Sequence, residues 1–169
     1  MLIILIKKEY ELVNSFFQFL YLLLMENSSI SSASEYRPKD FNEIIGQDAI
    51  VKTLSNAIDY QKIPQALLFC GPRGVGKTSC ARILAKKIND LDENFEYNIF
   101  ELDAASNNSV EDIRNITEQI RIPPQYGKFK VYIIDEVHML SNAAFNAFLK
   151  SLEEPPPHVV FILATTEKN

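Results

Sequence analysis

The eight residues GPRGVGKT, from Gly71 to Thr78, have types and spacing that could do chemistry. They fit the pattern G-x-x-x-x-G-K-[ST], in which glycines let the backbone wrap so that several N–H groups point at one spot. The ammonium group of Lys77 can reach the β- and γ-phosphates of a nucleotide, and the hydroxyl of Thr78 can ligate Mg²⁺. The pattern predicts a phosphate-binding loop.

A second set of chemical groups ends the run VYIIDE, where Asp135 and Glu136 follow four apolar residues. In a parallel sheet, ligands bind at the carboxyl ends of the strands. An aspartate there can hold Mg²⁺ through water, and a neighbouring glutamate can polarise the attacking water as a general base or by hydrogen bonding. Alone, the pair would also suit an ordinary acidic strand end. Together with the phosphate loop it favours ATP hydrolysis over transfer to a small acceptor.

The other histidine and arginine residues near these motifs give weaker evidence for a function. His138 is most simply a side chain at a helix entry, Arg73 is expected to face outward or toward another subunit, and Arg82 is expected to be solvated. Four basic residues form a modest basic group around the helical segment that starts at Ser109 and the turn that follows it: Arg114, Arg121, Lys128 and Lys130. Such a group is usually a solvated face, and contact with nucleic acid is the alternative.

The elements that would position these groups alternate along the chain. Four apolar runs predict strands at residues 66–70, 98–104, 130–135 and 159–164. Helical spacing of apolar residues predicts helices at 47–60, from the glycine loop to about Asn89, from Ser109 onward, and at 142–153. Strands that alternate with helices favour a parallel sheet, and consecutively apolar strands indicate helices on both of its faces.

The helix ends carry their own signals. Ser109 and Asp112 are spaced as a capping box, with Val110, Ile113, Ile116 and Ile120 on one face of the helix that follows. Ser141 is the expected N-cap of the last helix, and the prolines at 155–157 stop it. Phe145, Phe148, Leu149 and Leu152 are expected to be the inward-facing residues of that helix.

Composition sets limits on function. The chain of 169 residues is 47% hydrophobic and 23% charged, as expected of one soluble globular domain. Its formal net charge of -5 provides no general basic field for nucleic acid. Cys70 and Cys80 form no CxxC pair, which fits a reduced cytoplasmic setting and predicts no zinc site.

The N-terminal part differs from the rest in its pattern of apolar and charged residues. Residues 1–24 are apolar but interrupted by charges, and the uninterrupted run is shorter than the roughly 18 residues of a membrane span. We interpret them as an upstream extension outside the fold, with a membrane-surface helix as the alternative. Residues 25–36 form a serine-rich lead-in, and residues 37–169 form the nucleotide-binding core.

Four stretches, taken in order, resemble the gamma/tau subunits of bacterial DNA polymerase III, the AAA+ ATPase motors of the replicative clamp loader. They are YRPKDFNEIIGQDAIVKTL, GPRGVGKTSCARILAKKIN, ELDAASNNSVEDIR and YIIDEVHMLSNAAFNAFLKSLEEPPPHVVFILATTE. GPRGVGKT is shared by many ATPases, whereas DEVHML followed by AFNAFLKSLEEPP is typical of clamp loaders. ELDAASNNSVEDIR points to gamma/tau in particular. The resemblance covers about residues 25–169.

The resemblance implies roles for individual residues. Six residues match the stretch that packs around adenine: Tyr36, Arg37, Pro38, Ile44, Ile45 and Gly46. Nine would hold the phosphates: Gly71, Pro72, Arg73, Gly74, Val75, Gly76, Lys77, Thr78 and Ser79. The expected catalytic residues are Lys77, Asp135, Glu136 and Thr165, where Thr165 matches the residue called sensor 1. Thr78 and Asp135 would hold Mg²⁺.

The resemblance also implies a setting. ATP and Mg²⁺ would be the cofactors, and the partners would be further gamma/tau copies, delta, delta-prime, the sliding clamp and primer–template DNA, with no membrane. The family is classed with DNA-directed DNA polymerase, although nothing here looks like a polymerase active site. Two rival interpretations stay open: another P-loop enzyme such as a small-molecule kinase, and an inactive structural subunit.

The sequence departs from the family in several places. The stretch NDLDENFEYN replaces a four-cysteine zinc module, and the lead-in ASEYRP lacks the usual basic residues. The Ser-Arg-Cys motif, the helical lid, the collar and a fifth strand of the sheet would all follow residue 169. We therefore expect a truncated AAA+ domain, with weak nucleotide binding and negligible turnover in isolation.

Overall fold

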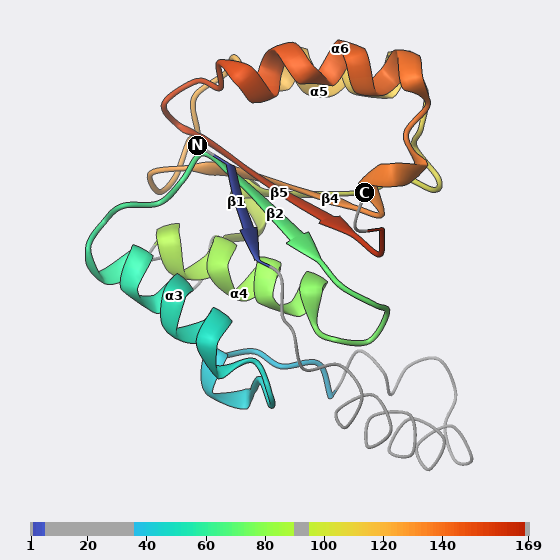
Figure 1. Cartoon of the computed structure of the whole chain (residues 1–169). Coiled ribbons are helices and arrows are strands. Elements are labelled where there is room, and N and C mark those ends of the chain that lie inside the picture. Colours follow the sequence, from blue (N-terminus) through green and yellow to red (C-terminus); the bar gives the residue numbers. More distant parts are fainter. Residues whose placement is uncertain (1, 6–35, 90–94, 168–169) are drawn as a thin grey trace.

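A computed structural model describes residues 2–5, 36–89 and 95–167, and every structural statement below refers to these residues. Five parallel strands form one sheet in the order β1-β2-β5-β4-β3. They are β1 (Leu2–Leu5), β2 (Ala66–Cys70), β3 (Ile99–Asp103), β4 (Lys130–Asp135) and β5 (Val159–Thr165). Helices cover both faces of the sheet (Figure 1). The α/β architecture predicted from the sequence is confirmed.

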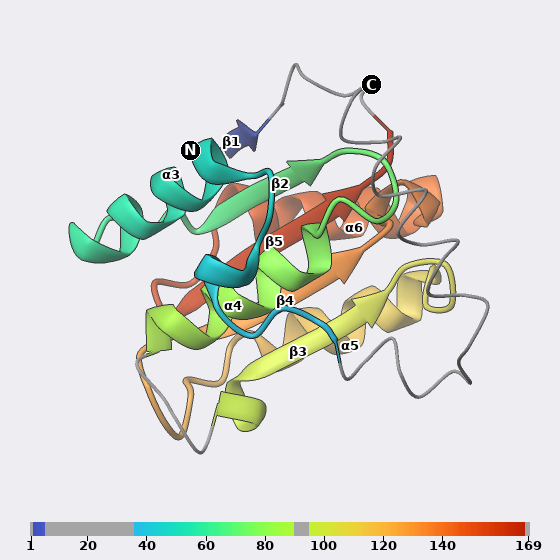
Figure 2. The same ribbon diagram turned by 90° about the horizontal axis from the view of Figure 1, so that it is seen from below.

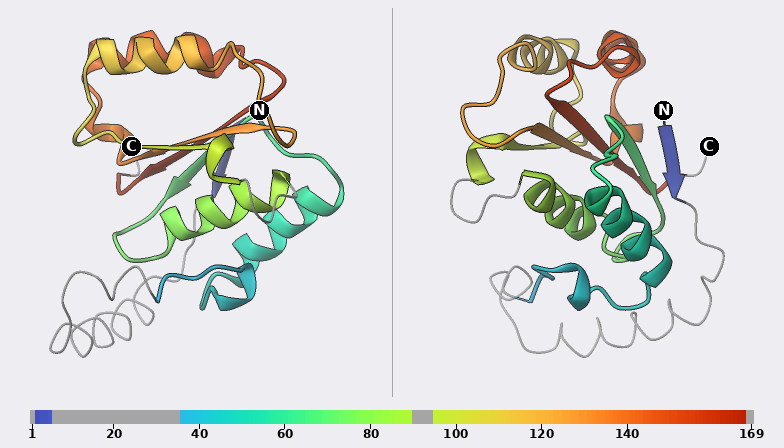
Figure 3. Two further views of the ribbon diagram at one scale, coloured as in Figure 1. Left: turned by 180° about the vertical axis from the view of Figure 1, so that it is seen from behind. Right: turned by 90° about the vertical axis from the view of Figure 1, so that its left-hand side faces the viewer.

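Strands β4 and β5 carry consecutive apolar residues because neither of their faces meets water. All seven residues of β5 and the first five of β4 are buried. A strand covered on one face only would alternate between apolar and polar residues. The consecutive apolar residues of these two strands therefore place them between the helical layers, as Figure 3 shows end-on.

One helical layer lies next to β2 and carries the phosphate loop. It consists of α3 (Asp48–Asp59) and α4 (Lys77–Asn89), which lie below the sheet in Figure 1 and in front of it in Figure 2. Buried residues of α4 such as Ile83 and Leu84 pack with Leu54 of α3 and with Leu67 of β2. This packing fixes α4 against the strand that precedes its N-terminus.

The opposite layer consists of α5 (Val110–Gln119) and α6 (Asn142–Glu153). Ser109 and Asp112 form the predicted capping box of α5, and the hydroxyl of Ser141 accepts the N–H of Ala144 at 3.2 Å at the start of α6. Short 3-10 turns lie at Phe41–Glu43, Phe95–Asn98 and Val137–Met139. Both predicted caps are confirmed.

The sequence prediction of which residues of α6 face inward is partly wrong. Phe148 is fully buried and meets Phe161 edge-on at 5.1 Å between ring centroids, as expected. Phe145, however, is 38% exposed, whereas Ala144 and Ser151 are buried. The helix is rotated so that the small Ala144 lies in the core cluster with residues of α5 and the sheet, and its backbone lies close to α5.

The N-terminal segment supplies an element that the sequence analysis places outside the fold. Leu2–Leu5 pair in parallel with β2, from Leu2 opposite Ala66 to Leu5 opposite Phe69. The outer edge of β2 is therefore paired, and five strands replace the four that were predicted. The rest of the extension lies outside the described residues. Among the helices that are described, none is long and apolar enough to cross a membrane.

Candidate functional site

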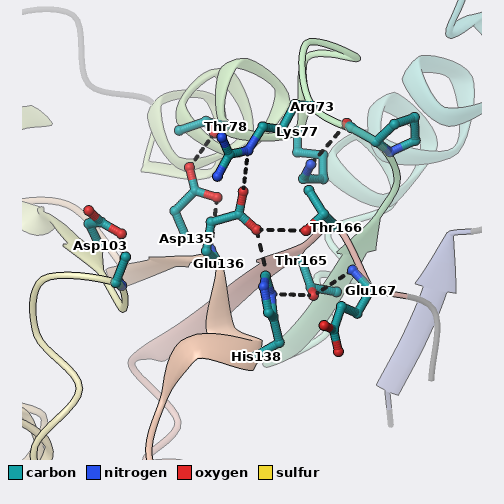
Figure 4. A network of polar contacts seen from close by, with 12 residues as sticks. Arg73, Lys77, Thr78, Asp103, Asp135, Glu136, His138, Thr165, Thr166 and Glu167 are labelled. Carbon is teal, nitrogen blue, oxygen red and sulfur yellow. Dashed lines mark hydrogen bonds and ion pairs between the residues drawn. The ribbon is translucent and has the colours of Figure 1, made fainter.

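Three adjacent strands bring the predicted catalytic residues to one edge of the sheet. Because β5 lies between β2 and β4, the ends of all three strands meet there. Cys70, the last residue of β2, pairs with Thr165 at the end of β5. Asp135 ends β4, and the phosphate loop leaves β2 beside it. Figure 4 shows Lys77, Asp135, Glu136 and Thr165 gathered at this edge.

The phosphate loop has the backbone form that its glycines predict. Gly74 and Gly76 have φ of +81° and +89°, and a Cβ at either position would meet nothing within 4 Å. The glycines are thus required by backbone conformation and not by lack of space. The N–H of Gly71 donates to the carbonyl of Thr165 at 3.1 Å, which ties the loop to β5.

Lys77 lies inside the loop at the first turn of α4. Its ammonium group donates to the carbonyl oxygens of Gly71 at 2.7 Å and Pro72 at 3.0 Å (Figure 4). Burial lowers the pKa of Lys77, while the nearby carboxylates of Glu136 and Asp135 oppose that shift. The positive helix end and this ammonium group together favour an anion at the loop.

Thr78 and Asp135 form a direct pair between α4 and β4. The Thr78 hydroxyl donates to Oδ2 of Asp135 at 2.6 Å, and Oδ1 of Asp135 accepts the N–H of Glu136 at 3.0 Å. Hydroxyl and carboxylate oxygens suit Mg²⁺, which usually keeps several waters and takes its remaining ligands from phosphates. Within the described ranges no cluster of three or more metal-ligating side chains occurs, so the phosphates and water would have to complete the coordination shell.

Glu136 has an uncommon backbone. Its φ of 49° and ψ of 46° lie in the left-handed region, which non-glycine residues seldom adopt. The turn directs its side chain toward β5 and the phosphate loop (Figure 4). Oε1 lies 3.5 Å from Nε of Arg73, and Oε2 accepts the hydroxyl of Thr166 at 3.2 Å. Strained positions of this kind cluster at functional sites.

Thr165 and His138 meet at the same edge. The Thr165 hydroxyl oxygen lies 3.0 Å from Nδ1 of His138 and accepts the N–H of Glu167 at 3.1 Å. Nδ1 of His138 also lies 3.5 Å from Oε2 of Glu136. Sequence reasoning missed this role of His138, and its only sequence signal was its position three residues after Asp135.

Two arginines behave differently from one another. Arg73 is 87% exposed at its side chain, as predicted, yet it still faces Glu136. Arg82 is not simply solvated, because its guanidinium pairs with both carboxylate oxygens of Glu101 on β3. That partner lies 19 residues further along the chain, on another element, so local spacing could not reveal it.

The residues expected around adenine do not share one environment. Ile44 is buried in the core beside α3 and α4, whereas Tyr36 is 78% exposed and Ile45 is 74% exposed. Arg37 and Pro38 are half-buried. Gly46 has φ of +74°, which turns the chain toward α3. The part of the site for the base thus remains a prediction.

Known proteins similar to this chain include replication proteins. The family model described as DNA polymerase III, delta subunit, matches residues 95–169. DNA polymerase III subunit tau of Bacillus subtilis (strain 168) is 49% identical over 149 residues, which cover 78% of this chain and 26% of that protein. The tau subunit of Escherichia coli (strain K12) is 43% identical over 152 residues, covering 80% and 24%. The chain thus spans about a quarter of these relatives.

Solved structures agree on the fold. The DNA polymerase III gamma subunit-related protein of Thermotoga maritima matches with a TM-score of 0.59 at 24% identity, over 67% of this chain and 39% of that one. The R170A variant of RuvB from Thermotoga maritima matches with a TM-score of 0.59 at 28% identity, over 78% and 42%. The chain is a homologue of the gamma/tau subunit of bacterial DNA polymerase III and has the fold of AAA+ ATPases.

Proposed function

We propose that this chain binds MgATP and is the nucleotide-hydrolysing part of a clamp-loader motor subunit. The observation that carries the proposal is the meeting of Lys77, Thr78, Asp135, Glu136 and Thr165 at one sheet edge. Lys77 and the N–H groups of the loop would neutralise the phosphates, and Thr78 with Asp135 would hold Mg²⁺. The 2.6 Å hydrogen bond between Thr78 and Asp135 already sets these two ligands side by side.

Glu136 would orient the attacking water. Its side chain is 17% exposed, and its carboxylate contacts Thr166 and Arg73 of the phosphate loop, which supports this role. A carboxylate there can accept a proton or a hydrogen bond from the attacking water. Catalysis would come chiefly from positioning and charge stabilisation.

The similarity to subunits of DNA polymerase III supports a proposal about the cellular setting. We propose that the chain works in the DNA polymerase III holoenzyme during DNA replication, with further gamma/tau copies, delta and delta-prime. Its hydrolysis of ATP would be coupled to loading a sliding clamp on primer–template DNA. The DNA contact would be local, because the chain carries a net charge of -5.

Nucleotide binding by the chain tests the proposal directly. Titration with fluorescent ATP and ADP in the presence of Mg²⁺ should show saturable binding and a raised melting temperature. Lys77→Ala should weaken binding at least about tenfold, because it removes the half-buried ammonium group of the loop. Lys52→Ala, an exposed lysine on α3, is the matched control and should bind as the unaltered chain does. Equal affinity in both variants would contradict the proposal.

A further inference from the structure

The contacts of Thr165 define what its hydroxyl can still do. A hydroxyl has one proton to donate and two lone pairs to accept with. One lone pair of Thr165 already accepts the N–H of Glu167 at 3.1 Å. The contact with Nδ1 of His138 at 3.0 Å uses either the second lone pair or the proton, depending on which partner carries the hydrogen.

These two alternatives have opposite consequences at a phosphate. If Nδ1 of His138 carries no hydrogen, the Thr165 hydroxyl donates its proton to Nδ1. Thr165 then has only a lone pair left, which an anionic oxygen repels. If Nδ1 carries the hydrogen, both lone pairs of Thr165 are filled. Its hydroxyl can then act only as a donor, which is what a phosphate oxygen needs.

The surroundings of His138 select between them. Oε2 of Glu136 lies 3.5 Å from Nδ1, and an ionised carboxylate is an acceptor only. A bare Nδ1 would set its lone pair against that oxygen, whereas Nδ1–H is attracted by it. The His138 side chain is 22% exposed, so water competes only partly for this position. Figure 4 shows the ring between Glu136 and Thr165.

We propose that His138 is a positioning residue that keeps a hydrogen on Nδ1, and so fixes Thr165 as a donor toward the terminal phosphate of a bound nucleoside triphosphate. The inference rests on the proposed function, since it concerns the same site. It links Glu136 to Thr165 through one imidazole ring.

The first test is spectroscopic and needs no nucleotide. The chain has two histidines, so long-range ¹⁵N–¹H correlations resolve both rings. His158 is an internal reference, because its Nε2 lies 2.9 Å from the carbonyl oxygen of Ile120 and must carry the hydrogen there. At about pH 8, where free histidine is neutral, His158 should show Nε2–H and His138 should show Nδ1–H. Nε2–H with a bare Nδ1 on His138 would overturn the inference.

The second test measures how the full chain discriminates ATP from ADP. Thr165→Val and His138→Ala should each weaken Mg²⁺-ATP binding about tenfold, as expected for one hydrogen bond to a charged group, with ADP binding unchanged within about twofold. The double variant should be no weaker than Thr165→Val alone, because both changes remove one interaction. His138→Asn should restore most of the preference, since its amide N–H can stand in for Nδ1–H.

The outcomes separate this inference from the proposed function. If the unaltered chain binds neither nucleotide, the proposed function fails, and the histidine spectra still decide the state of Nδ1. If Thr165→Val abolishes the preference for ATP while His138→Ala leaves it intact, the inference fails and the proposed function stands. Additive losses in the double variant would likewise overturn the link between the two residues.

Discussion

Tyr132 shows how a single polar group can oppose the stability of a core. Its side chain is 2% exposed on β4, where its ring stacks on Phe100 with centroids 4.8 Å apart. The hydroxyl is buried and has no hydrogen-bond partner in the described part of the chain. A buried hydroxyl without a partner costs roughly 1–3 kcal/mol. Tyr132→Phe should therefore raise the free energy of unfolding by about 1 kcal/mol, measured by urea denaturation.

Tyr132 should also make the stability of the fold depend on pH. Burial raises the pKa of Tyr132 from 10.0 to about 12, because the phenolate is the form that burial disfavours. A pKa raised on folding means that this contribution to stability is complete below about pH 10 and is lost as the pH rises toward 12. In Tyr132→Phe the part of the loss of stability at alkaline pH that is due to Tyr132 should be absent. An identical alkaline decline in both proteins, from pH 8 to 11, would contradict the assignment.

At the residue scale, the structure places the groups that are local to the chain where the sequence predicts them, and their roles stay predictions. The glycine loop, Lys77 and the Asp135–Glu136 pair follow from spacing alone, because consecutive residues share one turn or one strand end. The contact between His138 and Thr165 joins residues 27 positions apart. It depends on β5 lying beside β4, which no local pattern encodes. For the same reason the partner of Arg82 was not predicted.

At the scale of elements, the cap of α5 can be tested alone. The Ser109 hydroxyl accepts the N–H of Asp112 at 3.2 Å, and the Asp112 carboxylate accepts the N–H of Ser109 at 3.1 Å. Ser109→Ala leaves one helical N–H without this partner and should cost about 1 kcal/mol of the free energy of unfolding. Glu118→Ala, at an exposed position of the same helix, should change it by less than about 0.5 kcal/mol. Equal urea midpoints for the two variants would show that the cap adds nothing.

Helix ends were predictable because their signals are short. Ser109 and Ser141 lie next to the amides that they cap, so sequence and structure agree to within a residue. The rotation of α6 was not predictable in the same way. Its pattern of large apolar residues suggested Phe145 as a core residue, yet Ala144 is the residue buried in the core cluster that α6 shares with α5 and the sheet.

At the scale of the whole molecule, strand order decides what the site contains. The sequence predicted that polar strand ends would meet at one edge, because parallel strands all end there. It did not determine that β5 lies between β2 and β4, which brings Thr165 to the phosphate loop. Nor did it indicate that Leu2–Leu5 would pair with β2, since four apolar residues carry no information on their partner.

The pairing of Leu2–Leu5 with β2 leads to the last prediction, which concerns the outer edge of the sheet. In a strand, consecutive N–H groups point to opposite sides, so one of Ile3 and Ile4 donates toward β2. Proline has no N–H, and the double change Ile3→Pro/Ile4→Pro removes that donor whichever residue supplies it. The urea midpoint should fall by the equivalent of about 1 kcal/mol. Ile3→Val/Ile4→Val is the matched control, because valine retains the N–H and favours strands.

Measuring nucleotide affinity shows whether a change at the outer edge of the sheet affects the proposed site. The proposed site lies at the ends of β2, β5 and β4, with Lys77, Asp135 and Thr165. Breaking β1 removes only the outer neighbour of β2, and the pairing of β2 with β5 and of β5 with β4 stays. ATP binding by the proline variant should therefore stay within about twofold of the valine variant, while its stability falls. If both variants unfold at the same urea concentration, residues 2–5 do not cover β2 in solution, and the four strands β2 to β5 are sufficient for the fold.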